Sequence, residues 1–144
     1  MKRPETAKIR NIALVGHGTS GKTTLTEALL FSAGATTRLG RVEDGTTTTD
    51  FDEDEIRRKI SISTALAWGE WRGHKITLVD TPGFAAFLAD AKNALRVVDG
   101  AVVVVGATGG VKVSTEKVWS AAAALELPRV IYLSKMDKDR ADFA

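Results

Sequence analysis

The residues best suited to do chemistry form the run G-H-G-T-S-G-K-T-T at positions 16–24. The run fits the spacing G-x-x-x-x-G-K-[ST], in which a glycine-rich loop wraps a phosphate with its backbone N–H groups. Lys22 is expected to reach the β- and γ-phosphates, which makes it a catalytic candidate, and the Thr23 hydroxyl is expected to bind Mg²⁺. The residues predicted to contact the ligand are Gly16, His17, Gly18, Thr19, Ser20, Gly21, Lys22, Thr23 and Thr24.

A second motif, Asp80-Thr81-Pro82-Gly83, follows the strand-like residues I-T-L-V. An acid at the end of a buried strand beside a phosphate loop is placed to hold Mg²⁺, so Asp80 is a predicted metal residue acting through a water molecule. Gly83 lacks a Cβ, and its backbone N–H is therefore expected to approach a γ-phosphate as a second catalytic candidate. The alternative is a plain turn after a strand, because D-T-P-G is also good turn chemistry.

A third motif, Ser134-Lys135-Met136-Asp137, ends the last predicted strand. Asp137 is placed to accept two hydrogen bonds from the N1–H and 2-amino group of guanine, a donor pair that adenine lacks. Lys135 is expected to lay its aliphatic stem over the base, and Ser134 to add one or two hydrogen bonds. This motif is what favours GTP over ATP.

The elements around these motifs alternate between strand and helix, which predicts an α/β fold with a mostly parallel sheet. Strands are expected at 9–15, 75–80, 101–105 and 129–133, and helices at 22–33, 84–98 and from a Ser114 cap to just before Pro128. Alternating side chains at 60–68, followed by the turn Arg72-Gly73, predict an antiparallel hairpin at the sheet edge. Residues 34–59 show little periodicity and are expected to form a long functional loop.

Composition places the chain among ordinary globular proteins and excludes several classes. Of its 144 residues, 44% are hydrophobic and 26% charged, which suits one domain over residues 1–144 with a disordered stretch at 1–8. The net charge of +2 gives no reason to expect DNA binding. The sequence has no apolar run long enough to predict a membrane span, and its beginning lacks the apolar core of a signal peptide. The absence of cysteine fits a cytoplasmic protein.

With these motifs in order, the chain resembles the nucleotide-binding domain of translational GTPases. The segments G-R-V-E-D-G-T-T-T-T-D-F (40–51) and R-R-K-I-S-I (57–62) resemble the N-terminal G domain of elongation factor G and its elongation-factor-G-like paralogues. The likeness covers nearly all of residues 9–144 and implies a P-loop NTPase with a Ras-like G-domain core. It further implies binding of GTP or GDP with Mg²⁺, hydrolysis stimulated by the ribosome, a switch I at 34–63 (its loop at 34–60) and a switch II at 80–98.

Four positions depart from the family pattern. Phe84 stands where the family has a histidine that orients or polarises the attacking water, so intrinsic hydrolysis is expected to be weak. Ser61 stands at the position of the switch I threonine that binds the metal, with Thr64 as a nearby competitor. Ser134 replaces the base-recognition asparagine, and Thr19 replaces an aspartate that can hold a monovalent cation.

The chain stops soon after the third motif, whereas a complete G domain continues with further helix and strand. We therefore expect a C-terminally truncated, partial domain whose uncovered apolar edge favours self-association. The ribosome is an expected partner if the sequence is part of a full-length factor.

Four functions remain open at the level of sequence. The favoured one is a GTP- or GDP-binding domain with weak Mg²⁺-dependent GTP hydrolysis. The others are a non-hydrolysing P-loop module, a P-loop protein with little base preference that also takes ATP or ADP, and a structural fragment without a ligand.

Overall fold

A five-stranded sheet forms the centre of the protein, whose computed structural model describes residues 4–141. The strand order is β2-β3-β1-β4-β5, and every neighbouring pair is parallel except β2 with β3. The strands are β1 (Ile9–Gly16), β2 (Ala65–Trp71), β3 (His74–Asp80), β4 (Gly100–Gly106) and β5 (Arg129–Ser134). This arrangement confirms the predicted α/β fold with one antiparallel edge strand.

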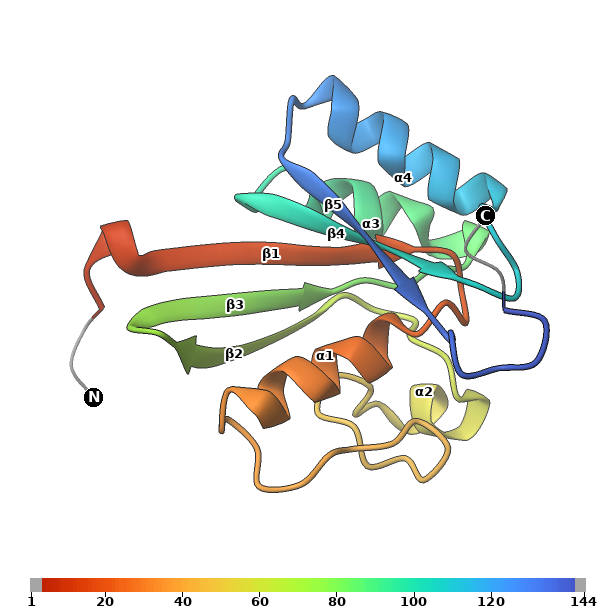
Figure 1. Cartoon of the computed structure of the whole chain (residues 1–144), viewed down its shortest axis with the longest axis horizontal. Helices are drawn as coiled ribbons and strands as arrows, with labels where there is room; N and C mark the ends of the chain where they lie inside the picture. The colour runs from red at the N-terminus through yellow and green to blue at the C-terminus, as the bar shows by residue number, and fades with distance from the viewer. Residues whose placement is uncertain (1–3, 142–144) are drawn as a thin grey trace.

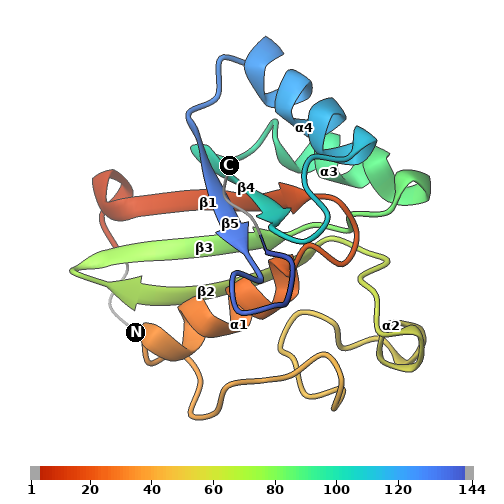
Figure 2. The same ribbon diagram turned by 45° about the vertical axis from the view of Figure 1, so that its right-hand side comes forward.

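Helices cover both faces of the sheet (Figure 1). One face carries α1 (Lys22–Ser32), together with the long segment after it that contains the short helix α2 (Glu53–Arg58). The other face carries α3 (Leu88–Ala94) and α4 (Val113–Ala124), and a view turned by 45° shows the same separation (Figure 2). The sheet is therefore the middle layer, and the carboxyl ends of its parallel strands meet at one edge.

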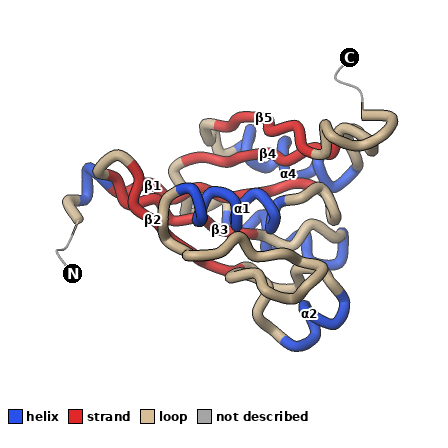
Figure 3. Tube along the Cα trace, turned by 60° about the horizontal axis from the view of Figure 1, so that its bottom comes forward, coloured by secondary structure: helices blue, strands red, loops and turns tan. Residues whose placement is uncertain are grey.

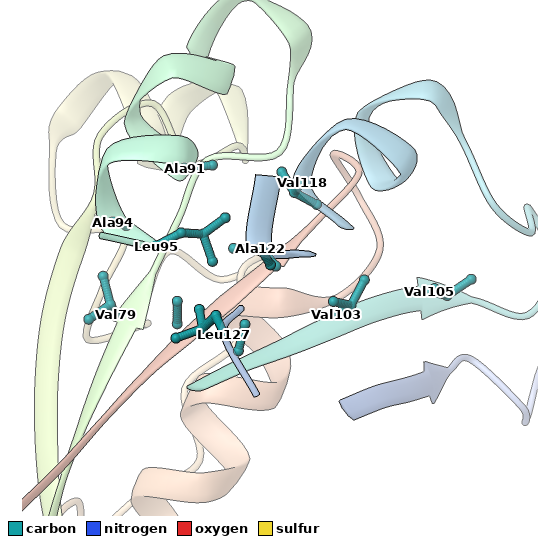
Figure 4. Close-up of a cluster of buried hydrophobic side chains, with 12 residues drawn as sticks. Val79, Ala91, Ala94, Leu95, Val103, Val105, Val118, Ala122 and Leu127 are labelled. Atoms are coloured by element: carbon teal, nitrogen blue, oxygen red, sulfur yellow. The ribbon is translucent and has the colours of Figure 1, made fainter. Parts of the chain in front are cut away.

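Two hydrophobic clusters hold these layers together. The larger one joins β1, β3 and β4 to α3 and α4 (Figure 4), and its buried members are Ala13, Val15, Val79, Ala91, Ala94, Leu95, Ala101, Val103, Val105, Val118, Ala122 and Leu127. The smaller one lies under α1 and consists of Leu14, Leu30, Ala67 and Leu78. Because β4 is packed from both sides, its V-V-V-V run is apolar throughout rather than alternating.

The β2–β3 hairpin forms as predicted, but its first strand begins later. Arg72 and Gly73 both have positive φ, at 48° and 76°, as a two-residue type I′ turn requires. The ladder starts where Ala65 pairs with Asp80, so the strand predicted at 60–68 is wrong for its first five residues. The backbone N–H groups of Ile62 and Ser63 bond to Glu55 instead of to β3.

The segment predicted to be a long loop, 34–59, contains α2. The Asp52 carboxylate caps this helix by accepting a hydrogen bond from the N–H of Asp54 at 2.8 Å. The Glu55 carboxylate in turn accepts a hydrogen bond from the N–H of Asp52 at 3.3 Å. This reciprocal capping box stabilises a helix too short to persist alone. The spacing D-x-x-E is the signal that the sequence offers for it.

Two other predicted boundaries are wrong. The helix expected at 84–98 is divided into a 3₁₀ turn at Ala85–Phe87 and α3, because Phe87 leaves the helical region with φ of −110° and ψ of 14°. The helix ends at Ala94, and Arg96 N–H bonds to Asn93 in a tighter turn beyond it. The N-cap of α4 is Lys112, and Ser114 is a buried residue of its first turn.

The beginning of the chain, where disorder is expected over residues 1–8, is described only in part. Thr6–Lys8 form a 3₁₀ turn that leads into β1. Residues 1–3 lie outside the described residues, so the expected disorder of this stretch stays a prediction.

No helix within residues 4–141 combines the length and the apolar character needed to cross a membrane.

The trace coloured by secondary structure shows how much of the chain between α1 and β2 is loop (Figure 3).

Candidate nucleotide-binding site

The loop between β1 and α1 has the geometry of a phosphate cradle. Gly21 is the N-cap of α1 with φ of 95°, and Gly16 turns the chain out of β1 with φ of 145°. The Lys22 ammonium folds back over the loop and donates to the carbonyl oxygen of His17 at 2.9 Å. The positive end of α1 and a buried ammonium group thus converge on one point, which favours an anion.

A cavity of about 220 Å³ opens at this point between the loop, the end of β3 and the segment around α2. Its lining residues are Gly18, Thr19, Gly21, Lys22, Thr23, Thr24, Val42, Glu43, Asp50, Lys59, Ile60, Ser61, Gly83, Phe84 and Lys135. Of the predicted loop contacts, Gly16, His17 and Ser20 do not line this cavity. His17 and Ser20 line a neighbouring cavity, which they share with residues that follow β4. His17 Nδ1 and Ser20 Oγ have no hydrogen-bond partner among the described residues.

Gly83 lies directly against the phosphate loop, as its predicted role requires. Gly18 N–H donates to the carbonyl oxygen of Gly83 at 2.9 Å. A Cβ on Gly83 would come within 2.5 Å of the Gly18 nitrogen and would also meet the Lys22 ammonium. Only glycine fits here, because the backbones of two motifs are in contact at this point.

Phe84 forms an apolar wall over the loop. A Cβ on Gly18 would lie 2.8 Å from the Phe84 ring, so the two residues pack without space between them. The ring lines the cavity and is 6.4 Å from the His17 imidazole, centroid to centroid. A phenyl ring at this position can neither accept nor donate a proton.

Two predicted metal residues, Thr23 and Ser61, are brought together by the structure. Their hydroxyl oxygens are 3.1 Å apart, although the residues are 38 positions apart in the chain. Neighbouring ligands of an octahedral ion are about 3.0 Å apart when each lies about 2.1 Å from Mg²⁺. Thr64, the competitor of Ser61, is exposed and does not line the cavity.

Asp80, the third predicted metal residue, is 1% exposed at the end of β3. One of its oxygens accepts the Thr49 hydroxyl at 2.8 Å, whereas the other, Oδ1, has no partner among the described residues. Burial raises the pKa of Asp80 to about 6, against the lowering effect of the neighbouring Thr49 and Thr23 hydroxyl groups. A buried carboxylate oxygen without a donor fits a water molecule bound to Mg²⁺.

The charges in the cavity partly balance one another. Burial lowers the pKa of Lys22 to about 8, although the nearby carboxylates of Asp80 and Asp50 act to raise it. Burial likewise raises the pKa of Asp50, which is 5% exposed. Lys22 and Asp50 in the cavity lining and the neighbouring Asp80 are thus three buried groups whose charged forms lose hydration.

The third motif reaches the loop only in part. Ser134 Oγ donates to the carbonyl oxygens of Ser20 at 2.5 Å and of Val105 at 3.2 Å, so it fastens the phosphate loop to β4 and β5. Lys135 lines the cavity with a φ of 60°. Asp137 does not line it; its carboxylate is exposed and lies 3.6 Å from the Lys138 ammonium.

Sequence reasoning missed four residues of this site. The Thr49 hydroxyl donates to Asp80, Asp50 lines the cavity, and Lys59 lines it with a φ of 56°. Glu27 is a buried acid on α1 that bonds to the segment after the helix. The spacing of Thr23 and Glu27, four residues apart on one helix face, was the one available signal for Glu27.

A mostly parallel sheet, a phosphate loop leading into α1 and a buried aspartate at the end of the neighbouring strand define the class of P-loop nucleotide-binding domains. Within that class, the chain belongs to the family described as the elongation factor Tu GTP binding domain, which it matches over residues 7–144.

Relatives and solved structures agree with this assignment. The chain is 46% identical over 138 residues to the mitochondrial ribosome-releasing factor 2 of Candida albicans, covering 96% of this chain and 17% of that protein. It is 42% identical over 143 residues to elongation factor G of Granulibacter bethesdensis, covering 99% of this chain and 21% of that protein. A crystal structure of a Thermus thermophilus protein superposes with a TM-score of 0.90 at 47% identity, covering 95% of this chain and 21% of that one.

The chain thus spans about a fifth of the length of the curated relatives it matches, at 17% and 21% of these two proteins. The activities and partners of those longer proteins as wholes are therefore only proposals for this chain.

Proposed function

We propose that this chain binds GTP and GDP together with Mg²⁺ and hydrolyses GTP slowly. The observation that carries the proposal is the 3.1 Å separation of the Thr23 and Ser61 hydroxyl oxygens beside the unpartnered oxygen of Asp80. Membership in a GTP-binding family supports the choice of ligand.

In this proposal each motif has a distinct task. Lys22 and the backbone N–H groups of the loop bind the β- and γ-phosphates and stabilise the charge that develops on them during transfer. Gly83 would offer its N–H to the γ-phosphate, Thr23 and Ser61 would hold Mg²⁺ through their hydroxyl groups, and Asp80 would act on it through water. The bound Mg²⁺ would supply further neutralisation of phosphate charge.

Hydrolysis is proposed to be slow because of Phe84. Its ring lies over Gly18 at the cavity wall, where it cannot accept a proton from an attacking water or fix that water by a hydrogen bond. Since phosphoryl transfer depends mainly on positioning and electrostatics, a slow reaction is expected to remain. If it does not, the chain is a non-hydrolysing binding module.

A second candidate is a nucleotide site with little base preference, and the exposed position of Asp137 favours it. The carboxylate lies outside the cavity lining, and Ser134 spends its hydroxyl on the phosphate loop. Guanine selectivity therefore depends on whether Asp137 turns toward a bound base.

Partners are proposed from the names of the relatives. Elongation factor G and ribosome-releasing factor 2 both suggest the ribosome as a partner of the protein that contains this domain. The predicted self-association finds support in β5, where Val130 and Ile131 are 60% and 63% exposed.

Two further expectations from the sequence stay predictions. One is that the chain does not bind DNA. The other is a cytoplasmic location, which differs from the mitochondrial name of the Candida relative.

Calorimetry with GDP, GTP and ADP, with and without Mg²⁺, tests the proposal. We expect GDP and GTP to bind more tightly with Mg²⁺, ADP to bind at least tenfold more weakly, and Lys22→Ala to abolish all three. Equal affinities for GDP and ADP would favour the second candidate. No binding by the wild-type chain would refute nucleotide binding altogether.

A further inference from the structure

Glu27 is a buried acid that the proposed function does not use. It lies on α1 one turn after Thr23 and is 1% exposed. Its two carboxylate oxygens accept backbone N–H groups from different places in the following segment: Oε1 from Thr48 at 2.5 Å and Oε2 from Gly40 at 3.2 Å. One side chain therefore binds both ends of the stretch from Gly40 to Thr48.

The stretch between these contacts, residues 40–48, is a closed loop, called here the 40–48 loop. Arg41 N–H donates to the Thr46 hydroxyl at 3.0 Å, and Thr46 N–H donates to the Arg41 carbonyl oxygen at 3.1 Å. At Gly40 a Cβ would come within 2.6 Å of the Thr46 carbonyl oxygen and would also meet the Glu27 carboxylate. The ends of the loop are thus packed tightly onto α1.

Backbone amides are what keep the Glu27 charge in place. Within residues 4–141, no lysine or arginine lies within 4.0 Å of its carboxylate. Burying a carboxylate without donors is costly, whereas hydrogen bonds to a charged acceptor are stronger than neutral ones. The loop therefore stabilises the buried Glu27 carboxylate with its backbone N–H donors, and Glu27 in turn holds the loop against α1.

The loop is connected directly to the proposed phosphate and metal site. Its residues Val42 and Glu43 line the cavity. Immediately after Thr48, the Thr49 hydroxyl donates to Asp80 at 2.8 Å, and Asp50 lines the cavity while only 5% exposed.

We propose that Glu27 is a positioning residue that fastens the 40–48 loop to α1 and thereby keeps Thr49 on Asp80 and Asp50 in the nucleotide cavity. That Glu27 holds the 40–48 loop follows from its hydrogen bonds alone, whereas the effect of this contact on nucleotide binding rests on the proposed function. The helix that grips phosphate with its first turn also holds, one turn later, the segment that closes over it.

Glu55 provides a matched comparison. It is a second buried glutamate, 3% exposed, and it accepts the N–H groups of Ile62 at 2.9 Å and Ser63 at 3.0 Å. It therefore holds a different part of the same segment, next to Ser61. The exposed Glu116 on α4 serves as a control without such contacts.

Amide hydrogen exchange without nucleotide tests the mechanism. Glu27→Gln keeps the shape of the side chain but turns an –NH₂ group toward one of the two amides, so only one hydrogen bond can remain. We expect exchange at Gly40 or Thr48 to accelerate at least tenfold while Ile62 and Ser63 keep wild-type rates. Glu55→Ala removes the single oxygen that accepts both the Ile62 and Ser63 N–H groups, so it should give the opposite pattern, and Glu116→Gln should change neither. Unchanged rates at both Gly40 and Thr48 in Glu27→Gln would overturn the proposal.

A second variant covers the case in which Glu27→Gln does not fold. Gly40→Ala leaves Glu27 intact but forces the loop end away from it, and exchange at Gly40 and Thr48 should again accelerate. Wild-type rates in this variant would count against the contact.

The functional consequence is measured as the ratio of GDP affinities with and without Mg²⁺. Glu27→Gln should reduce this ratio about tenfold, and in a Thr49→Ala background the same substitution should change it less than twofold, because the effect passes through Thr49. Additive effects would contradict this route. If the wild-type chain binds no GDP, the proposed function fails, while the exchange experiment still decides whether Glu27 holds the loop.

Discussion

Three ionisable side chains at the candidate site are buried, each no more than 5% exposed: Lys22, Asp50 and Asp80. Burial disfavours the charged form of each, which lowers the pKa of Lys22 to about 8 and raises the pKa of Asp80 to about 6. The protein without ligand therefore carries an electrostatic cost at the site that a cation and a phosphate would relieve.

Asp80→Asn tests this cost through the pH dependence of stability. The folded pKa of about 6 lies above the unfolded value of 3.8, so between these values the folded protein holds a proton that the unfolded chain has released. Stability must then fall as pH rises through this window. Relative to wild type, Asp80→Asn should gain about 2–3 kcal/mol between pH 4 and pH 6.5, measured by urea unfolding in EDTA. A constant difference across that range would show that burial does not perturb Asp80.

Phe84→His should restore the group that the family pattern places over the loop. An imidazole there can orient water or transfer a proton, and such a group contributes typically about 10²-fold or more. Single-turnover GTP hydrolysis should rise accordingly, whereas Phe84→Leu, which keeps the wall apolar, should not raise it. Equal rates in the two variants would place the limit on hydrolysis elsewhere.

At the scale of elements, the segment between α1 and β2 depends on side-chain contacts rather than on periodic structure. Its one helix, α2, has six residues and relies on the capping box between Asp52 and Glu55. Glu55 also accepts the N–H groups of Ile62 and Ser63, so the cap and the approach to β2 share one carboxylate.

Asp52→Ala should therefore loosen α2 locally. Loss of an N-cap costs about 1 kcal/mol, which corresponds to roughly fivefold faster amide exchange across the helix Glu53–Arg58. Asp52→Asn keeps a capping oxygen and should exchange at nearly the wild-type rate. Equally fast exchange in both variants would mean that the cap does not limit the opening of α2.

The contrast between α1 and this segment explains what could be predicted from sequence. The ends of β1 and α1 agree with the prediction to within one residue, because apolar periodicity and glycine spacing are local signals. The start of β2 at Ala65 was missed because Ile62 and Ser63 bond to Glu55, and such contacts leave no periodic trace. In the candidate site, motif spacing predicted Lys22 and Asp80, which the structure places in and beside the cavity, whereas Thr49 and Asp50 lie outside every motif.

At the scale of the whole molecule, the proposed site joins elements from across the chain. The loop follows β1, Asp80 ends β3, Ser134 ends β5, and Ser61 comes from the segment before β2. A ligand bound at a site built from these four elements should stabilise the fold as a unit.

Saturating GDP with Mg²⁺ should therefore raise the melting temperature. At a hundred times its Kd, a ligand stabilises by about 2.7 kcal/mol, which for a domain of this size corresponds to roughly 6–15 °C. Differential scanning calorimetry measures the shift, with Lys22→Ala as the control that should show none. A shift of the same size in that variant would place the bound GDP outside the phosphate loop.

The hydrogen bond from Ser134 to Ser20 spans 114 positions, so the last strand completes a loop made near the beginning of the chain. During synthesis at about 5–20 residues per second, roughly 6–23 s would pass between the synthesis of Ser20 and that of Ser134. A nascent chain therefore carries its phosphate-binding sequence long before it can hold the loop in shape. Under the proposed function, nucleotide would be captured only after β5 has been synthesised.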